Sequence, residues 1–323
     1  MLAFSAFPGG RVEVRARAKV NLGLEVLGRR ADGYHELRSV MWAIELADRV
    51  TLEASGGDIT LECAAPDIPR TRDNLAWQAA ELVRRESRTA TGFRIRIEKR
   101  IPVAAGLGGG STDAAAVLAA FGCLQNRWLG PRRLGAMAVA LGMDVPFFLG
   151  WSPALAQGRG EELRPVRASA DLSLVLANPG FPLPTREVYA RLEPGDYGDG
   201  RRVDALVTAL RRGARAVAAT VTNGLERATG RLWPGLTEVK AALLEAGCLA
   251  ALMSGSGPTV LGIAPSHRAA LRIRDALGAR PWRLWVTRTV TGPALTIRRG
   301  APPRGRPGMR RRKAGTTWGV AKW

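Results

Sequence analysis

The chain has 323 residues, enough to bury one large or two modest hydrophobic cores. Its 48 Lys and Arg exceed its 28 Asp and Glu, and the net charge of +20 points to anionic partners, either nucleic acid or small anionic substrates. The longest apolar run, residues 134–151, is interrupted by Asp144 and Pro146, which argues against a membrane span, and three widely spaced cysteines argue against a disulfide scaffold.

The first predicted element is a long strand. Apolar and polar residues alternate from residue 12 to residue 26, which is typical of one strand, or of two strands joined by a bulge, buried on one face. Lys19 and Asn21 are two residues apart and are predicted to share the polar face. Residues 50–62 resemble a hairpin that turns at residues 55–58.

A helix is expected after the cap-like Asp73-Asn74, followed by a strand over residues 93–97. The stretch PVAAGLGGGSTDAAAVL comes next, at residues 102–118. It begins with a glycine loop, residues 102–110, which we call the first glycine loop, and it continues as an alanine-rich helical pattern. A glycine loop between a strand and a helix is a common way to hold phosphate.

The remaining elements are predicted in mixed order. They are helices over 131–141, 203–216, 235–246 and from about 265, and strands over 171–178 and 282–289, with a second glycine loop leading into a strand within 253–264. Strands and helices that do not alternate strictly favour an α+β fold. We expect an N-terminal domain over 1–160 and a C-terminal domain over 161–297. Residues 298–323, with nine basic and no acidic residues, are expected to form a disordered basic tail.

The first glycine loop matches neither of the two best-known phosphate loops. Ser111 stands where the dinucleotide fingerprint needs its third glycine, and no lysine lies between Lys99 and Lys240 to complete a Walker loop. Backbone chemistry remains as an explanation. Gly108 to Gly110 can take positive φ and turn N–H groups toward an anion, and Ser111 or Thr112 can cap the helix. A plain tight turn is the alternative.

Four segments together resemble the GHMP small-molecule kinases over roughly residues 12–290. They are AKVNLGLEVLGRRADGYHEL (18–37), PVAAGLGGGSTDAAAVL, LGMDVPFFLG (141–150) and MSGSGPTVLG (253–262). The sequence DGYH at 32–35 is similar to the branch of that family that acts on cytidine diphosphate-linked methylerythritol in isoprenoid precursor synthesis. The resemblance implies a two-domain α+β fold, with an N-terminal domain like ribosomal protein S5 domain 2 and a C-terminal ferredoxin-like α/β sandwich.

The resemblance also implies an enzyme that uses ATP and Mg²⁺ to phosphorylate the 2-hydroxyl of this substrate. Asp144 matches the catalytic base and Lys19 the lysine paired with it. Ser111 is the expected direct Mg²⁺ ligand, whereas Asp113 is expected to face solvent. Residues expected to bind ATP are Asn74, Lys99, Pro102, Val103, Ala104, Ala105, Gly106, Leu107, Gly108, Gly109, Gly110, Ser111 and Thr112.

The cytidine end has its own expected residues. Tyr34 and Tyr189 match the pair of aromatic rings that sandwiches cytosine, and His35 matches the residue that hydrogen-bonds the edge of the base. Asn21, Thr185, Gly255, Ser256 and Gly257 are further expected substrate contacts. The family pattern is broken at Gly224, where an acidic residue is usual, and at Gly23, where a bulky apolar residue is usual.

Two alternatives stay open. Another GHMP kinase, acting on homoserine, mevalonate or a sugar, would have no use for the sequence at 32–35. A basic nucleic-acid-binding protein would explain the charge but not the Lys19 and Asp144 pair. The N-terminal sequence lacks a basic region before its short apolar patch, so no signal peptide is expected and a cytoplasmic monomer or homodimer without a membrane partner is predicted.

Overall fold

The structure is a computed structural model that describes residues 10–88, 91–124, 130–169 and 171–299. The expectation of no signal peptide and most of the predicted basic tail therefore fall outside the described residues. In the described part of the chain, none of the helices is both long and apolar enough to cross a membrane.

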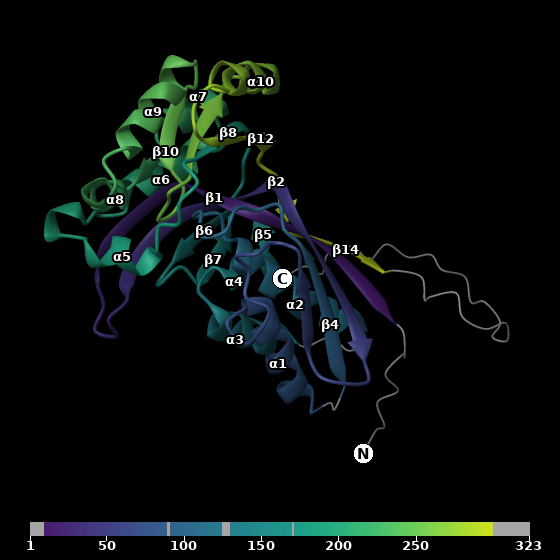
Figure 1. Cartoon of the computed structure of the whole chain (residues 1–323). Helices are drawn as coiled ribbons and strands as arrows, with labels where there is room; N and C mark the ends of the chain where they lie inside the picture. The colour runs from purple at the N-terminus through teal and green to yellow at the C-terminus, as the bar shows by residue number, and fades with distance from the viewer. Residues whose placement is uncertain (1–9, 89–90, 125–129, 170, 300–323) are drawn as a thin grey trace.

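A large mixed sheet forms the base of the molecule, with strand order β14-β1-β2-β4-β3 (Figure 1). Its bounds are β1 Arg11–Arg29, β2 His35–Ser55, β3 Thr60–Cys63, β4 Gly92–Glu98 and β14 Leu295–Arg299. Three shorter strands join this path: β6 (Ala154–Gln157) pairs with β2, β7 (Glu162–Pro165) with β6, and β9 (Thr222–Asn223) with β1.

The predicted hairpin over residues 50–62 is wrong. Strand β4 lies between β2 and β3, pairing antiparallel with β2 and parallel with β3. The chain passes from β3 through helix α1 (Leu75–Ser87) to β4, so the two parallel strands are joined by a helical crossover. Both β2 and β3 pair with β4, which lies much further along the chain, and not with each other across the predicted turn.

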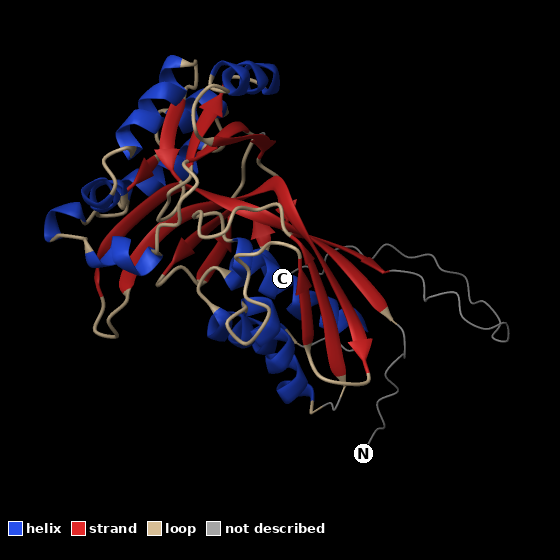
Figure 2. Ribbon diagram, in the orientation of Figure 1, coloured by secondary structure: helices blue, strands red, loops and turns tan. Residues whose placement is uncertain are grey.

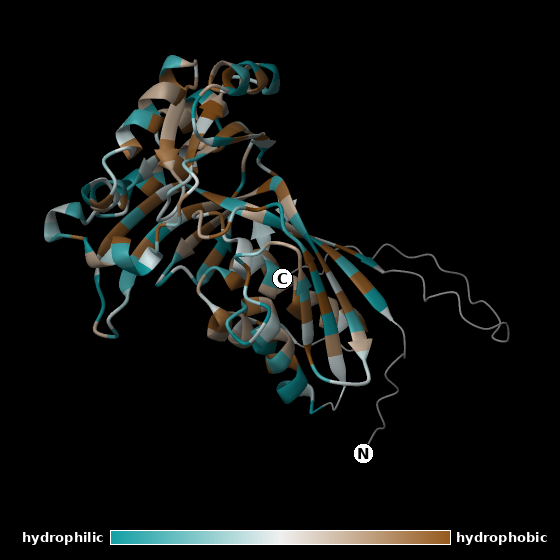
Figure 3. Cartoon of the chain, viewed as in Figure 1, coloured by the Kyte–Doolittle hydropathy of each residue, from teal (hydrophilic) through white to brown (hydrophobic). Residues whose placement is uncertain are grey.

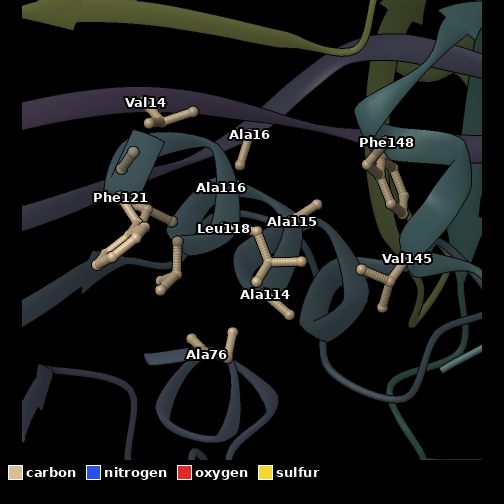
Figure 4. Packing of buried hydrophobic residues seen from close by; sticks show 14 of the residues in the cluster. Val14, Ala16, Ala76, Ala114, Ala115, Ala116, Leu118, Phe121, Val145 and Phe148 are labelled. Atoms are coloured by element: carbon tan, nitrogen blue, oxygen red, sulfur yellow. The ribbon is translucent and has the colours of Figure 1, made fainter. Parts of the chain in front are cut away.

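Helices cover one face of this sheet (Figure 2). They are α1, α2 (Gly109–Leu124), α3 (Pro131–Leu141) and α4 (Val145–Leu149). Helix α2 lies at the centre: Ala114, Ala115 and Ala116 are fully buried, and small side chains let the helix approach β1 and α1 closely (Figure 4). The other face of the sheet carries the polar half of the alternation, visible as alternating bands on β1, β2 and β4 (Figure 3).

A second, four-stranded sheet has the order β10-β11-β8-β12. Its bounds are β8 Ser173–Asn178, β10 Ala250–Met253, β11 Val260–Ala264 and β12 Arg283–Arg288. Strands β5 (Trp151–Ser152) and β13 (Gly292–Pro293) form a small separate pair. Helices of this half are α5 Thr185–Ala190, the 3-10 turn Pro194–Asp196, α6 Arg201–Ala209, α7 Ala214–Ala218, α8 Glu226–Leu232, α9 Leu236–Glu245 and α10 His267–Ala276.

Strand β1 joins the two halves. Its first part alternates as predicted, with Val12, Val14 and Ala16 against the helices. From Lys19 to Val26 every residue is buried, so the prediction that only one face is buried is wrong there, whereas Lys19 and Asn21 share a face as predicted. Helix α6 and strand β9 cover this second part: a Cβ on Gly23 would lie 2.6 Å from Leu206 Cδ2. The close approach of α6 gives a physical reason for glycine at position 23.

Strands from the C-terminal half complete the large sheet. Strand β14 pairs with β1 and includes Arg298 and Arg299, which the sequence analysis assigned to the tail. Val12 lies opposite Arg299 and Ala16 opposite Leu295, so the antiparallel ladder includes residues 295–299. The large sheet therefore takes β7, β9 and β14 from beyond residue 160.

Candidate active site

A cleft of about 420 Å³ opens where the middle of β1 meets the first glycine loop, the start of α4, helix α5 and the loop between β10 and β11. The predicted site residues line it, with four exceptions: Leu107, Thr112, Tyr34 and His35. Leu107 and Thr112 point into the protein, since they are 1% and 0% exposed. The cleft thus gathers segments that are more than two hundred residues apart in the sequence.

Lys19 and Asp144 meet in this cleft. Lys19 Nζ lies 3.4 Å from Asp144 Oδ2, with the lysine side chain 5% exposed and the aspartate side chain 39% exposed. Asp144 stands at the N-cap of α4 but makes no capping hydrogen bond with its side chain. Its carboxylate is therefore available to the cleft, next to an ammonium group held in a nearly buried position.

Asn21 fixes the position of Lys19. Lys19 Nζ donates to Asn21 Oδ1 at 2.6 Å, and Asn21 Nδ2 donates to Ser39 Oγ at 2.8 Å. Ser39 Oγ in turn donates to the carbonyl of Gly23 at 2.7 Å. Because β1 and β2 supply all four residues, the ammonium is oriented by the rigid centre of the sheet.

The first glycine loop differs in conformation from the prediction. Positive φ occurs at Ala104 (49°), Gly106 (74°) and Gly108 (70°), whereas Gly109 and Gly110 already belong to α2. Ser111 and Thr112 therefore lie inside the helix and do not cap it; Thr112 N donates to the Gly108 carbonyl at 2.9 Å. The N–H groups of the first helical turn are left without intrahelical partners, as at every helix start.

Most of the loop glycines are required by packing within the protein. A Cβ on Gly106 would lie 2.2 Å from the Ser254 carbonyl oxygen, and one on Gly108 would lie 2.8 Å from Phe148 Cζ. Gly110 is different, since its nearest neighbour would be Leu75 Cδ1 at 3.7 Å. Gly110, which lines the cleft, is thus the loop glycine at which packing leaves the most room for a side chain.

Lys99 lies beneath the loop, in a buried ion cluster. Its Nζ lies 2.5 Å from Asp48 Oδ2 and 2.9 Å from Asp113 Oδ2. Asp48 Oδ1 accepts from the backbone N–H groups of Arg100 and Ile101 at 2.6 and 2.9 Å. The expectation that Asp113 faces solvent is wrong: the residue is 3% exposed. Lys99 therefore ties β2 to the first turn of α2 from below the loop.

The cluster is electrostatically unbalanced. Burial raises the pKa of Asp113 to about 7, because the stabilising charge of Lys99 is shared with Asp48. Burial also acts to lower the pKa of Lys99, but the two carboxylates outweigh it and raise that pKa. Lys99 is consequently charged at neutral pH, and its ammonium lies between Asp48 of β2 and Asp113 of α2.

Asn74 contributes chiefly to structure. Its Oδ1 accepts from Ala76 N at 2.9 Å, which caps α1, and its Nδ2 donates to the Pro69 carbonyl at 2.8 Å. Both polar atoms of the side chain are therefore engaged within the protein, although the residue lines the cleft.

The second glycine loop, residues 254–257, lies directly on Lys19 and on the first loop. A Cβ on Gly255, which has φ of 56°, would lie 3.1 Å from Asn21 Oδ1 and 3.3 Å from Lys19 Nζ. Ser254 bridges the two halves: its Oγ donates to the Gly106 carbonyl at 3.1 Å and accepts from Asn21 N at 3.3 Å. The two glycine loops are therefore one packed unit.

Polar residues of the C-terminal half close this side of the cleft. Thr185 Oγ1 and Ser256 Oγ are 2.8 Å apart, which brings α5 against the second glycine loop. Asn223 Nδ2 donates to the carbonyls of Met253 and Gly255 at 2.8 Å, so it holds that loop in place. A side chain at the neighbouring Gly224 would find ordinary contact distances, 3.5 Å or more, so packing does not explain the glycine there.

The aromatic residues lie at the outer end of the cleft. His35 and Tyr189 rings are 5.2 Å apart, whereas Tyr34, half exposed, has the Arg159 guanidinium 5.1 Å from its ring centre. Burial and the charge of Asp144 raise the pKa of Tyr189, so the phenol stays neutral. Burial and then Arg29 lower the pKa of His35, which keeps the imidazole neutral near pH 7.

Sequence reasoning missed three residues that shape the site. Arg159 lines the cleft and covers Tyr34, Ser254 joins the glycine loops, and Asn223 holds the second loop. An arginine carries little signal in so arginine-rich a chain. Ser254 belongs to the quoted segment MSGSGPTVLG, and its place directly before Gly255 was the available signal.

Few side chains in the described part of the cleft are suited to bind Mg²⁺ directly. Among the described residues, no group of three or more His, Cys, Asp and Glu side chains gathers to hold a metal ion. Asp113, the nearest carboxylate along the helix, is committed to Lys99. Ser111 lines the cleft in the first turn of α2, and a hydroxyl there suits Mg²⁺, which takes most of its ligands from phosphate and water.

Comparison with known proteins identifies the family. The model for the GHMP kinase N-terminal domain matches residues 74–150, and the model for the GHMP kinase C-terminal domain matches residues 203–283. The 4-diphosphocytidyl-2-C-methyl-D-erythritol kinase of Pelotomaculum thermopropionicum is 44% identical over 85% of this chain and 96% of its own length. The enzyme of the same name from Symbiobacterium thermophilum is 42% identical over 86% of this chain and all of its own length.

Solved structures agree. A crystal structure of 4-(cytidine 5'-diphospho)-2C-methyl-D-erythritol kinase is 41% identical, covers 86% of this chain and 98% of its own, and superposes with a TM-score of 0.75. Homoserine kinase from Cytophaga hutchinsonii, with a TM-score of 0.72, 20% identity and coverage of 92% of this chain and 100% of its own, shares the fold. From the site, the family models and these relatives together, we conclude that the chain belongs to the 4-diphosphocytidyl-2-C-methyl-D-erythritol kinase family of the GHMP kinases.

Proposed function

We propose that the chain transfers the γ-phosphoryl group of ATP to the 2-hydroxyl of 4-diphosphocytidyl-2-C-methyl-D-erythritol, releasing ADP and the 2-phosphate. The name of the relatives supports the choice of substrate. The observation that carries the proposal is the 3.4 Å approach of Lys19 Nζ to Asp144 Oδ2 in a cleft that both glycine loops line. In such a reaction the protein mainly positions the reactants and stabilises charge.

Asp144 is the proposed base. A carboxylate with a reference pKa of about 3.9 is too weak to deprotonate an alcohol in advance. Proton transfer to Asp144 therefore takes place late, as the hydroxyl oxygen bonds to phosphorus and becomes acidic. The partial exposure of Asp144 leaves an oxygen open toward substrate, beside the ammonium of Lys19.

Lys19 is the proposed charge-stabilising residue. Asn21 accepts one of its hydrogen bonds, which leaves further donors for Asp144 and for an oxygen of the reacting groups. Its low exposure matters, because an ammonium removed from water interacts more strongly with developing negative charge. Lys19 N also donates to the Leu107 carbonyl at 3.0 Å, so the lysine and the first glycine loop are held at a fixed separation.

The phosphates of ATP are assigned to the start of α2. This helix has 16 residues, and its free N–H groups and dipole present positive potential to the cleft at Gly109 and Gly110. Ser111 is the proposed direct ligand of Mg²⁺, which when bound neutralises phosphate charge. Lys99 adds a positive charge from below, although its two carboxylate partners largely cancel that charge.

The cytosine ring is assigned to the aromatic end of the cleft. Tyr189 and Arg159 line the cleft and Arg159 lies over the ring of Tyr34, which supports stacking of the base at this end. A neutral His35 can both donate and accept a hydrogen bond at the edge of the base. Thr185 and Ser256 offer hydroxyls to the part of the substrate between cytosine and the reacting hydroxyl.

We also propose that this reaction takes place in the cytoplasm, in a monomer or homodimer, and that the catalytic residues belong to an N-terminal domain ending near residue 160. The free cysteines support the location, because Cys63 and Cys248 are buried as thiols. The match of separate N- and C-terminal family models supports the division.

A substrate panel tests the proposed function. ADP release is measured with ATP and Mg²⁺ and, in turn, the cytidine diphosphate-linked methylerythritol, homoserine and mevalonate. We expect turnover with the first compound alone. Turnover with homoserine or mevalonate at a comparable kcat/KM would reject the assignment of this substrate.

A further inference from the structure

A second cavity, of about 530 Å³, lies away from the cleft and shares no lining residue with it. It forms on the face of the large sheet opposite helices α1 and α2. Because Val14 and Ala16 face those helices, the intervening Arg15 and Arg17 face the other way. Arg49 lies directly across from Arg15 on β2.

Strand β12 of the second sheet forms a wall of this cavity. Trp285, Val286 and Thr287 line it. Thr287 Oγ1 accepts from Leu46 N at 3.3 Å, and this contact holds β12 against β2. The cavity is therefore a recess between the two sheets.

Its lining is strongly basic. The arginines are Arg15, Arg17, Arg49, Arg100 and Arg298, and the carboxylates are Glu13, Glu45 and Asp48. Every one of these carboxylates is already paired: Glu13 with Arg49, Glu45 with Arg288, and Asp48 with Lys99.

Four of the arginines have no carboxylate partner within ion-pair distance among the residues the structure describes. Arg15 donates to the Glu45 carbonyl at 2.9 Å, and Arg17 to Thr296 Oγ1 at 2.8 Å. Arg100 and Arg298 are exposed, and neither forms an ion pair with any residue that the structure describes. Four guanidinium groups that lack a carboxylate at ion-pair distance in the described part of the chain thus line one recess.

Arg17 is the most constrained of the four. Its Nε is buried and makes no hydrogen bond, although a buried charged donor without a partner is costly. Burial, and then the charge of Arg15, lower the pKa of Arg17, with Glu45 acting in the opposite direction. An anion in the cavity would offset the repulsion between Arg17 and Arg15.

We propose that this cavity, which we call the arginine cavity, is a binding site for a small molecule that carries a diphosphate or two neighbouring phosphate groups. Arg15 and Arg298 lie diagonally across the β1–β14 ladder, since Arg15 pairs with Thr296 and Glu13 pairs with Arg298. Guanidinium groups bind phosphate oxygens in a bidentate manner. Diagonal neighbours on one face of an antiparallel pair are about 7–8 Å apart, so the two arginines are placed to bind two neighbouring phosphates. The indole of Trp285 offers a surface for the organic part.

Calorimetric titration of the full-length protein with inorganic pyrophosphate, with and without excess ADP to occupy the cleft, tests the site. The test variant is Arg15→Ala/Arg298→Ala. The matched control is Arg94→Ala/Arg96→Ala, which removes two arginines that do not line the cavity and are more than half exposed. A single Arg298→Ala variant serves if the double variant unfolds, because Arg298 is exposed.

We expect the unaltered protein and the control to retain a pyrophosphate site that ADP does not displace. The test variant should bind there at least about tenfold more weakly, as expected for loss of charged hydrogen bonds. Equal affinity in the test variant, or complete displacement by ADP, would overturn the proposal. So would arginine-dependent binding of a single-stranded oligonucleotide without an ADP-resistant pyrophosphate site.

Discussion

Lys19 Nζ and Asp144 Oδ2 lie 3.4 Å apart, although Lys19 lies in the middle of strand β1 and Asp144 precedes the five-residue helix α4. Asn21 holds the lysine, and Phe148 of that short helix lies against Gly108 of the first glycine loop. The proposed base, the proposed charge stabiliser and the phosphate loop are thus parts of one packed arrangement, and a change in one is felt by the others.

The first prediction concerns Asp144. Asp144→Asn keeps the size of the side chain but removes the proton acceptor, so kcat should fall by about 10²- to 10⁴-fold. Binding of ATP, measured by titration, should change little because the phosphates are assigned to the start of α2. Asp73→Asn is a suitable control, since Asp73 also lines the cleft but lies in the turn before α1. Near-normal turnover in Asp144→Asn would remove the base assignment.

The second prediction distinguishes a glycine that the fold requires, Gly108, from a glycine that is proposed to leave room for ATP, Gly110. Gly108→Ala combines a φ of 70° with a contact of 2.8 Å to Phe148, so it should lower the free energy of unfolding by about 1–3 kcal/mol. Gly110→Ala makes only an ordinary contact, 3.7 Å to Leu75 Cδ1, and lies within a helix, where alanine is favoured over glycine by up to about 1 kcal/mol. Gly110→Ala should therefore not destabilise the protein, yet it should raise the KM for ATP.

Chemical denaturation and steady-state kinetics check this pair. If Gly110→Ala left the KM for ATP unchanged, the phosphates would not approach the protein at the first turn of α2. Equal stability of Gly108→Ala and the unaltered protein would show that the loop can relax away from Phe148.

The third prediction concerns the cytosine end. Tyr189→Ala should raise the KM for the cytidine substrate by about tenfold or more, because stacking on an aromatic ring contributes about 1–3 kcal/mol per base. The KM for ATP should stay within a factor of about two. Tyr197→Ala is a useful comparison, because Tyr197 also lies near His35, at 6.3 Å between rings, but does not line the cleft. The same KM increase for both variants would reject the stacking role of Tyr189.

The fourth prediction follows from the buried cluster. The pKa of Asp113 is raised from an ordinary value of 3.8 to about 7 in the folded protein. Between these values the unfolded chain has lost the proton that the folded chain keeps, so stability falls as pH rises from about 4 to about 7 and levels off above it. The largest slope from one such group is about 1.4 kcal/mol per pH unit.

Asp113→Asn removes this titration. The free energy of unfolding of the variant, relative to the unaltered protein, should therefore increase steadily between pH 5 and pH 7. Urea denaturation at several pH values, without nucleotide, provides the comparison. Parallel curves for the two proteins would show that Asp113 is ionised throughout and that Lys99 fully compensates it.

Much of the secondary structure follows from local patterns. The alternation in β4, the asparagine cap before α1 and the glycine after α3 are local signals, and the structure has each of these elements at its predicted position. The hairpin failed because the pairing of β2 was decided by β4, which no local pattern connects to it. Burial on both faces of β1 likewise depends on α6, almost two hundred residues away.

The candidate site likewise includes features that the sequence indicates and features that only contacts between distant segments decide. The roles expected of Lys19 and Asp144 came from resemblance to a family, since an isolated strand lysine and a helix-end aspartate carry no such signal. The burial of Asp113 could not be predicted, because its partner Lys99 and the competing Asp48 come from other elements. Interactions between distant segments decide the electrostatics of this site.

Identification of the product tests the central claim most directly. The full-length protein is incubated with ATP, Mg²⁺ and 4-diphosphocytidyl-2-C-methyl-D-erythritol, and the products are followed by phosphorus NMR. The account predicts one equivalent of ADP for each new phosphate monoester, carried on the 2-hydroxyl. A phosphate on another hydroxyl, or ADP release without a phosphorylated product, would contradict it.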